Sequence, residues 1–229
     1  RKFFWKSISN KIKFVTCPSY DLKKQLEVLN IFSDKKIYFL PDAIIRIKKL
    51  KKEKKFSLDE GIPKNKKIIL SAGRLTKQKN FSYLINEFSE FSKTNDQFVL
   101  LILGDGEKKE ELLKLIAKVG VQNKVFLLGH KDNIYSYMHS SSVFVLSSLW
   151  EDPGFVIVEA ALCNLFVISS NCPNGPREFL NDGKRGILFE SNKEKAIFRS
   201  LQKFNQMDKN KIFDDKLKLK KEAKKYTIF

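Results

Sequence analysis

The fold is decided by residues 67–106, which read KIILSAGRLTKQKNFSYLINEFSEFSKTNDQFVLLILGDG. One short apolar run opens this stretch and another closes it, and between them apolar side chains recur at helical spacing. The helical stripe consists of Phe81, Leu84, Ile85, Phe88 and Phe91. Asn80 stands before it as a good helix N-cap. A strand, a helix and a second strand in this order predict one unit of a parallel sheet.

The same alternation continues to residue 189. A second helical stripe is formed by Leu112, Leu113, Ile116 and Val119, and both stripes are interpreted as core rather than as a cofactor-binding segment. The predicted strands cover residues 68–72, 98–103, 125–128, 143–147, 166–169 and 186–189. The sequence therefore predicts an α/β fold with a doubly wound, parallel, six-stranded and Rossmann-like sheet that has helices on both faces.

The segments on either side of this sheet differ from it. Residues 11–16 and 37–40 are predicted as strands, and residues 20–29 as a helix capped by Ser19. This strand-helix-strand unit is too small to stand alone, which indicates the end of a preceding α/β domain. Because residue 1 is Arg, we expect a piece cut from a longer protein. The expected organisation is the end of an amino-terminal domain over 1–45, a lysine-rich surface linker over 46–66, a Rossmann-like domain over 67–190 and C-terminal helices over 191–229.

Composition excludes several classes of protein. The chain has 229 residues, of which 42% are hydrophobic and 12% aromatic, so it is too apolar to be a disordered tail. It contains no run of 18 apolar residues that would predict a membrane-spanning helix. Cys17, Cys163 and Cys172 form no C-x-x-C pair, so we expect neither a disulfide framework nor a zinc site, and a reducing compartment fits.

The net charge of +18 is distributed unevenly. Positive charges exceed negative ones by 11 in residues 1–66 and by 7 in residues 191–229, whereas residues 67–190 are neutral. A nucleic-acid-binding domain needs its positive field on the folded binding face. Because the predicted Rossmann-like domain has no such excess, nucleic acid is not expected as a partner.

The basic flanks allow two interpretations. A lysine-rich surface exposed to water is the simpler one, and we favour it. Contact with an anionic lipid surface is the other, and it gains support from Phe3, Phe4 and Trp5, which stand among basic residues as in interfacial segments.

Two polar loops should meet at the carboxyl ends of neighbouring strands. In a doubly wound sheet, strands 1 and 4 are adjacent, and ligands bind at their carboxyl ends. The loop over 73–80 follows strand 1 and contains one glycine, Gly73, instead of the G-x-G-x-x-G of dinucleotide-binding proteins. It offers cations: Arg74 can hold two phosphate oxygens, and Lys79 can supply a point charge. This pair suits a leaving diphosphate.

The loop after strand 4 offers carboxylates. Glu151 precedes Pro153-Gly154, and Glu159 follows about one turn into the next predicted helix. Glu151 can accept hydrogen bonds from sugar hydroxyls, and Glu159 can face a ribose. Alternatively, Glu159 is an exposed helix carboxylate and Glu151 a partner of the helix dipole. The free amide groups at the start of the helix would point at phosphate, and they belong to Gly154, Phe155 and Val156.

An ordered series of motifs resembles one known family. The series consists of Gly73-Arg74-Leu75, Lys79-Asn80, Gly104-Asp105-Gly106, Gly129-His130, Glu151-x7-Glu159, Ser169-Ser170, Gly175-Pro176-Arg177-Glu178, Asn181-Asp182-Gly183 and Gly186. Over about residues 36–200 it resembles the carboxyl-terminal half of the family 4 (group 1) retaining glycosyltransferases of GT-B fold. Asp152-Pro153 departs from the small or Phe residue that is more usual before the glycine, and it leaves the donor sugar open.

The resemblance implies transfer of a sugar from a nucleotide-diphosphate sugar with retention at the anomeric carbon. It implies that Arg74, Lys79 and Glu151 are the catalytic residues, which stabilise the leaving group and the donor sugar. The implied donor-binding residues are Gly73, His130, Gly154, Phe155, Val156 and Glu159. The chain contains no D-x-D, so we expect neither a metal ion nor another cofactor, and the two cations with the helix terminus take the place of a metal.

The resemblance also implies partners and a location. The acceptor, a glycan or a glycolipid, would bind to the amino-terminal domain, which is mostly absent here. The segment alone should then bind donor weakly and should not turn over. We expect a cytoplasmic enzyme of bacterial polysaccharide or lipopolysaccharide synthesis, at the inner face of the membrane if the flanks contact lipid. Two alternatives stay open: a noncatalytic nucleotide-binding or partner-binding module, and a non-hydrolysing nucleotide-sugar epimerase.

Overall fold

The computed structural model describes all residues except 1, 34–35, 44, 53–58, 60 and 229. Its centre is an all-parallel six-stranded sheet in the order β6-β5-β4-β7-β8-β9. The strands are β4 (Lys67–Ala72), β5 (Phe98–Leu103), β6 (Val125–Leu127), β7 (Val143–Leu146), β8 (Phe166–Ser170) and β9 (Ile187–Phe189). The predicted fold class is confirmed, and each of the six strands predicted for this sheet lies within about one residue of its observed bounds.

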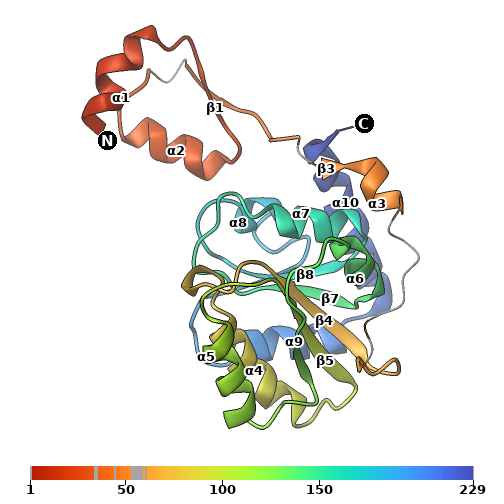
Figure 1. The fold of residues 1–229 in the computed structure, drawn as a ribbon. Helices are drawn as coiled ribbons and strands as arrows, with labels where there is room; N and C mark the ends of the chain where they lie inside the picture. Colours follow the sequence, from red (N-terminus) through yellow and green to blue (C-terminus); the bar gives the residue numbers. More distant parts are fainter. Residues whose placement is uncertain (1, 34–35, 44, 53–58, 60, 229) are drawn as a thin grey trace.

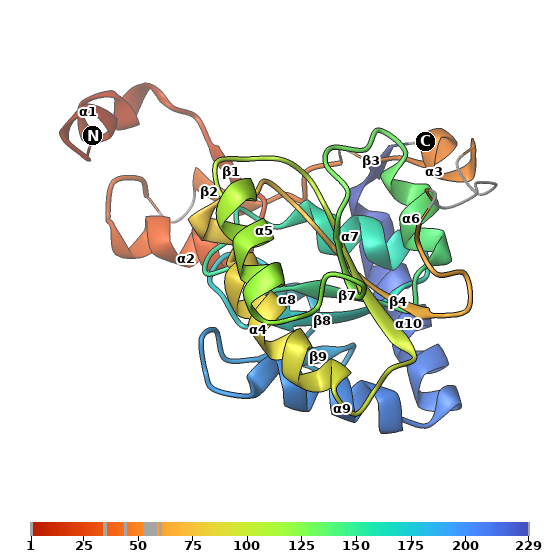
Figure 2. The same ribbon diagram turned by 60° about the horizontal axis from the view of Figure 1, so that its bottom comes forward.

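Helices cover both faces of this sheet (Figures 1 and 2). One face carries α4 (Phe81–Ser92), α5 (Lys109–Lys118) and α9 (Ala196–Gln206), whose apolar side chains form one core with the sheet. The other face carries α6 (Ile134–Ser140), α7 (Phe155–Leu162) and α10 (Lys209–Ala223), which form a second core. A sheet that is buried on both sides explains why its strands are continuous apolar runs rather than alternating ones.

Two details of the predicted helices differ from expectation. Asn80 does precede α4, but it adopts a left-handed backbone with φ 54°, and its side chain does not cap the helix. The Asn80 amide instead donates to Asn192 Oδ1 at 2.8 Å, which ties α4 to the loop after β9. Leu113 was predicted as core but is 43% exposed, because α5 buries Leu112 and Ile116 and turns Leu113 to solvent.

The register of the central strands places two loops side by side. Leu70 of β4 pairs with Phe144 of β7, and both strands run in the same direction. Their carboxyl ends therefore meet at one edge of the sheet. The short helix η3 (Lys77–Lys79) lies in the loop after β4, and α7 begins in the loop after β7.

The amino-terminal part is a small unit of its own. It contains α1 (Lys2–Ile8), the short helix η1 (Ser9–Lys11), β1 (Val15–Cys17), α2 (Tyr20–Val28) and β2 (Ile37–Phe39), with β1 parallel to β2. The side chain of Ser19 caps α2 as predicted, because it accepts a hydrogen bond from Leu22 N at 3.2 Å. Helix α1 was not predicted, and β1 begins four residues later than expected. In the described part of the chain, no helix has both the length and the apolar character needed to cross a bilayer.

The segment expected as a linker, residues 46–66, begins with regular structure. Strand β3 (Ile45–Arg46) leads into α3 (Ile47–Lys52), and Leu50 and Ile62 are buried in the core beneath α7 and α10. Residues 53–58 and 60 of this segment lie outside the described residues. The short helix α8 (Pro176–Phe179) precedes β9. At the other end of the chain, the short helix η4 (Lys224–Tyr226) precedes β10 (Thr227–Ile228). Strand β10 pairs in parallel with β3.

Candidate functional site

A cleft of about 560 Å³ opens at the carboxyl ends of β4 and β5. Its walls come from the loops after β4, β5 and β6 and from the start of α7. The lining residues are Ala72, Gly73, Arg74, Lys79, Leu103, Gly104, Asp105, His130, Lys131, Asp132, Ile134 and Val156. Five residues that the sequence predicted for the site belong to this wall: Gly73, Arg74, Lys79, His130 and Val156. Glu151, Gly154, Phe155 and Glu159 stand next to the wall rather than in it.

Arg74 is a cation in the cleft wall that is available to a ligand. Its side chain is exposed, and it makes no hydrogen bond or ion pair within the described part of the chain. His130 is also exposed, with 77% of its side chain accessible, and its Nε2 lies 3.3 Å from Asp132 Oδ1. An anion that entered the cleft would meet the Arg74 guanidinium without displacing a protein partner.

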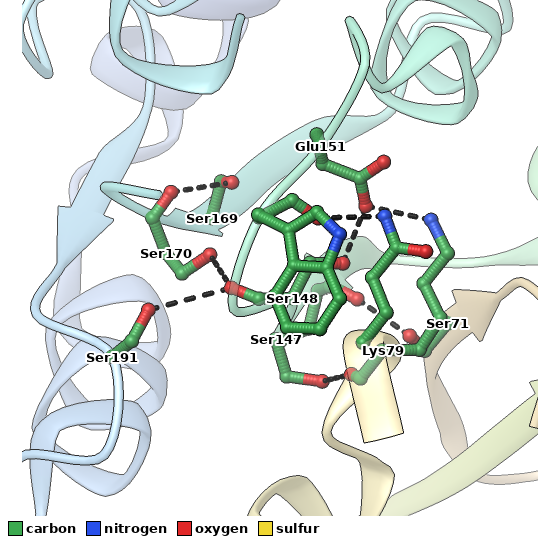
Figure 3. Close-up of polar contacts among 11 residues, drawn as sticks. Ser71, Lys79, Ser147, Ser148, Glu151, Ser169, Ser170 and Ser191 are labelled. Atoms are coloured by element: carbon green, nitrogen blue, oxygen red, sulfur yellow. Dashed lines mark hydrogen bonds and ion pairs between the residues drawn. The ribbon is translucent and has the colours of Figure 1, made fainter. Parts of the chain in front are cut away.

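Lys79 and Glu151 are held against each other. Lys79 Nζ lies 2.6 Å from Glu151 Oε1, and only 14% and 5% of the two side chains are exposed. Ser148 Oγ donates to the same carboxylate oxygen (Figure 3). The cation that the sequence predicted for phosphate and the carboxylate that it predicted for sugar therefore form a buried pair. Such a pair holds each partner in place, and removing either one leaves a buried charge uncompensated.

Serines fix the loop that carries Glu151. Ser148 is fully buried, and its carbonyl oxygen accepts hydrogen bonds from Ser170 Oγ at 2.6 Å and from Ser191 Oγ at 3.3 Å (Figure 3). Ser147 Oγ donates to Lys79 O at 2.7 Å and so links the loop after β7 to the loop after β4. Sequence reasoning missed the roles of these serines. The available signal was that adjacent serines directly follow one apolar run and end another.

Two glycines let the loops approach each other. A Cβ atom on Gly104 would lie 2.0 Å from Gly73 O, which is far closer than two such atoms can approach. A Cβ atom on Gly73 would lie 2.8 Å from Lys79 Cε, so the lysine stem crosses the space that a side chain would fill. Glycine is thus required here to bring Lys79 to Glu151 and to close the floor of the cleft.

Helix α7 presents free amide groups beside this pair. As predicted from Pro153-Gly154, the helix begins at Phe155, with Gly154 at the N-cap position and φ 79°. The first bond of the helix runs from Ile157 N to Gly154 O at 3.1 Å. Among the described residues, the amides of residues 154–156 have no acceptor. These groups and the positive end of the helix dipole favour an anion at this place.

Glu159 lies one turn further along α7 than Val156. Its side chain is half-buried, and its Oε1 accepts a hydrogen bond from Tyr135 Oη of α6 at 2.9 Å. Sequence reasoning placed Glu159 correctly within the helix but did not find Tyr135. That contact joins α6 to α7, and neither helix indicates it by spacing.

The loop after β6 is anchored from outside the cleft. Lys131 Nζ and Tyr137 Oη donate to the two oxygens of Asp59, each at 2.6 Å. These two hydrogen bonds lower the pKa of the Asp59 carboxyl below its usual value of 3.8. Asp59 belongs to the segment predicted as a surface linker, so sequence reasoning gave it no role. It holds in place the loop that contributes His130 and Lys131 to the cleft.

The cysteines contribute no reactive thiol. All three are buried, and burial raises the pKa of the Cys172 thiol to about 11. A thiol with that pKa stays protonated at neutral pH, so it is a poor nucleophile. Metal-independent binding remains a prediction. In the described chain, His, Cys, Asp and Glu side chains do not gather in groups of three or more that could hold an ion.

Comparisons with known proteins agree on one family. A family model described as glycosyl transferases group 1 matches residues 52–226. One relative is the N-acetylgalactosamine-N,N'-diacetylbacillosaminyl-diphospho-undecaprenol 4-alpha-N-acetylgalactosaminyltransferase of Campylobacter jejuni. It is 35% identical over 180 residues, and the alignment covers 74% of this chain and 48% of that protein. The chain is also 37% identical over 161 residues to an uncharacterised glycosyltransferase of Methanocaldococcus jannaschii, and this alignment covers 65% of this chain and 40% of that protein. The chain thus spans less than half the length of these relatives.

Solved structures show the same fold. A glycosyltransferase of Rickettsia africae superposes with a TM-score of 0.84 at 19% identity, over 99% of this chain and 62% of that one. The HepE protein of Anabaena, crystallised with UDP and glucose, superposes with a TM-score of 0.79 at 19% identity, over 99% and 63%.

Proposed function

The chain belongs to the group 1 glycosyl transferases, and on that premise we propose that it is the donor-binding half of a retaining glycosyltransferase of GT-B fold. The enzyme would move a sugar from a nucleotide-diphosphate sugar to a glycan or glycolipid acceptor. One observation carries the proposal: Arg74, whose guanidinium is free, and Lys79 line one cleft, and the Glu151 partner of Lys79 and the free amides at the start of α7 lie next to its wall. These groups match the charge of a nucleoside diphosphate.

Arg74 and Lys79 would hold the diphosphate. The planar guanidinium of Arg74 can donate two parallel hydrogen bonds to phosphate oxygens, whereas Lys79 supplies a point charge from a fixed position. As the bond to the sugar breaks, negative charge grows on the leaving diphosphate, and prepositioned cations stabilise it. The amides at the start of α7 would add neutral donors to the same anion.

Glu151 would hold the donor sugar with the oxygen that the protein does not use. Lys79 and Ser148 both bond to Oε1, which leaves Oε2 to accept from sugar hydroxyls. The carboxylate is rigid because Lys79, Ser148 and the hydrogen bond from Glu151 N to Pro173 O at 3.2 Å all fix it. A rigid Glu151 carboxylate that binds the sugar hydroxyls would keep the anomeric carbon in a fixed position relative to the leaving diphosphate.

Glu159 would contact the ribose. The hydrogen bond from Tyr135 Oη to its Oε1 fixes the carboxylate on α7, one turn from the cleft-lining Val156, where ribose hydroxyls could donate to it. His130 would lie further out, near the base or the phosphates. The acceptor would bind to the remainder of the enzyme. A glycolipid is the leading choice for it, because the name of the Campylobacter relative includes an undecaprenol-linked saccharide. Such an acceptor would place the enzyme in the cytoplasm at the inner face of the membrane.

The test removes the free cation. Arg74→Ala in the full-length enzyme should weaken UDP binding by about 10 to 100-fold, because a charge-assisted and partly desolvated contact contributes about 1.5 to 3 kcal/mol. Isothermal titration measures the affinity, and sugar transfer from a panel of nucleotide sugars measures the rate. Arg199→Ala is the matched control, since Arg199 is exposed on α9 away from the cleft. Unchanged affinity and rate in Arg74→Ala would reject the clamp.

The same assay separates the two alternatives. A noncatalytic module would bind UDP but transfer no sugar from any donor. A non-hydrolysing epimerase would convert one nucleotide sugar into its epimer without an acceptor.

A further inference from the structure

The outward face of α10 differs from an ordinary solvent-exposed helix face. Inward, α10 buries Leu219 and Ala223 against the core beneath α7, and the buried Asp215 pairs with Lys211 at 2.5 Å. Outward, Phe213 is 55% exposed and Leu217 is 47% exposed. These two residues are four apart, so they lie one above the other on the same side of the helix.

Lysines surround this apolar pair. A helix turns by about 100° per residue, which places Lys220 and Lys216 on one side of the pair and Lys221 and Lys218 on the other. Six lysines of this region form no ion pair with any described residue: Lys209, Lys216, Lys218, Lys220, Lys221 and Lys224. By contrast, Lys211 and Lys225 are neutralised by Asp215 and Glu222.

The positive charge on this face is not balanced by the protein. Asp214 is the one acidic residue among the outward positions of α10 within the described chain, and the other acids of the helix are used by the pairs to Lys211, Lys225 and Arg185. Lys216 is half-buried at the edge of this face, and burial, followed by the neighbouring charge of Lys220, lowers its pKa. These lysines are therefore available to an external anion.

We propose that the outward face of α10, formed by Phe213, Leu217 and these six lysines, docks onto a bilayer that contains anionic phospholipid. Lysine ammonium groups would meet the headgroup phosphates, and the Phe and Leu side chains would enter the boundary between headgroups and acyl chains. A nucleic acid would use the lysines but gives no reason for two apolar side chains at their centre. The inference deepens the proposed glycolipid acceptor, which such docking would bring within reach.

Helix α1 is the competing surface. Phe3, Phe4 and Trp5 are exposed there, and they are the aromatic residues for which the sequence predicted lipid contact. The Trp5 and Phe32 rings pack edge to face with their centroids 6.3 Å apart, so α1 is attached to the amino-terminal unit. Helix α1 thus also presents aromatic side chains next to the exposed Lys6, so the test uses variants of both helices to separate the two surfaces.

Flotation of the 229-residue chain with vesicles tests the proposal. We expect binding to phosphatidylcholine vesicles that contain one quarter phosphatidylglycerol, no binding to phosphatidylcholine alone, and loss of binding at high salt. Phe213→Ser with Leu217→Ser should weaken binding at least about tenfold. Lys218→Gln, Lys221→Gln and Lys224→Gln together should weaken it on the order of 100-fold at low salt.

Controls make each outcome decisive. Arginine at the same three lysine positions should restore binding, because it keeps the charge. Phe3→Ser with Phe4→Ser should leave binding unchanged. The proposal is overturned if the α10 variants bind like the unmodified chain, if only the α1 variant loses binding, or if the chain binds duplex DNA but not vesicles. Melting temperatures check that each variant folds. The UDP affinity of the full-length enzyme is measured separately, so that a failure of docking leaves the proposed donor site standing.

Discussion

At the scale of single residues, the Lys79–Glu151 pair decides how the cleft is built. Both groups are mostly removed from water and lie 2.6 Å apart, with Ser148 as a further donor. The pair makes Lys79 a less available cation than Arg74. Substitutions at Lys79 will therefore change folding as well as ligand binding, whereas substitutions at Arg74 report on the ligand alone.

We predict that Lys79→Met lowers the free energy of unfolding by about 3 kcal/mol, because it strands the buried Glu151 carboxylate. The double variant Lys79→Met with Glu151→Gln should recover most of this loss, since it removes both charges. Urea unfolding of the single and double variants gives the coupling energy directly. Full stability in the single variant would show that the carboxylate finds another partner, and the description of the pair as a mutual anchor would be wrong.

The sequence predicted these residues but not their relationship. The spacing of Glu151 and Glu159 around Pro153-Gly154 places one carboxylate before α7 and one inside it, because proline and glycine interrupt a helix. No spacing indicates that Lys79, 72 residues earlier, reaches Glu151. That contact depends on the strand order and on the absence of a side chain at Gly73.

At the scale of elements, prediction succeeded where burial dominates. The six central strands are continuous apolar runs, so their positions follow from composition alone. The two-residue strands β3 and β10 were missed because their pairing joins positions 45 and 227, and neither segment is long enough to show a pattern. Asn80 was correctly predicted to precede α4, but its side chain does not cap the helix. Its amide donates instead to Asn192, which lies in a loop distant in sequence.

The loop after β6 depends on a residue outside the central sheet. Hydrogen bonds from Lys131 and Tyr137 keep the pKa of Asp59 below 3.8 in the folded protein. A lowered carboxyl pKa means that the ionised group stabilises the fold above pH 3.8, and that this contribution is lost as the pH falls through the lowered pKa.

Asp59→Asn should therefore unfold less steeply with acid than the unmodified chain, and at neutral pH it should be less stable by about 1 kcal/mol. Free energies of unfolding measured from about pH 2 to pH 7 test both statements. Asp42→Asn is the control, because Asp42 is exposed and has no ion pair within the described chain. Parallel acid profiles for Asp59→Asn and the unmodified chain would contradict the role of this anchor.

At the scale of the whole molecule, few polar contacts join the amino-terminal unit to the central domain. Tyr20 N donates to Glu178 Oε2 at 2.8 Å, and Gln25 Nε2 donates to Asn174 Oδ1 at 2.8 Å. Burial raises the pKa of Glu178, so its carboxylate is held there at a cost in hydration. The contact lies at the start of α2, where the helix dipole favours a carboxylate.

Glu178→Ala should release the first turn of α2, because Tyr20 N loses its acceptor. Hydrogen exchange of the α2 amides should become at least about tenfold faster. Glu178→Gln should exchange like the unmodified chain, since its amide oxygen still accepts and carries no charge that burial would penalise. Equal exchange in the Ala and Gln variants would show that other contacts hold the unit in place.

The pairing of β3 with β10 has a topological consequence. Ile45 and Thr227 are paired neighbours in this two-stranded sheet, so the polypeptide between them starts and finishes at one place. If the segment from β3 to β10 is expressed by itself, we expect it to tolerate circular permutation, because a short joint can connect β10 to β3 while a new opening is made in an exposed turn. The turn at Gly120, where nothing crowds the backbone, offers such an opening. The central domain thus begins and ends at paired strands, and the strand-helix-strand unit precedes it in the sequence.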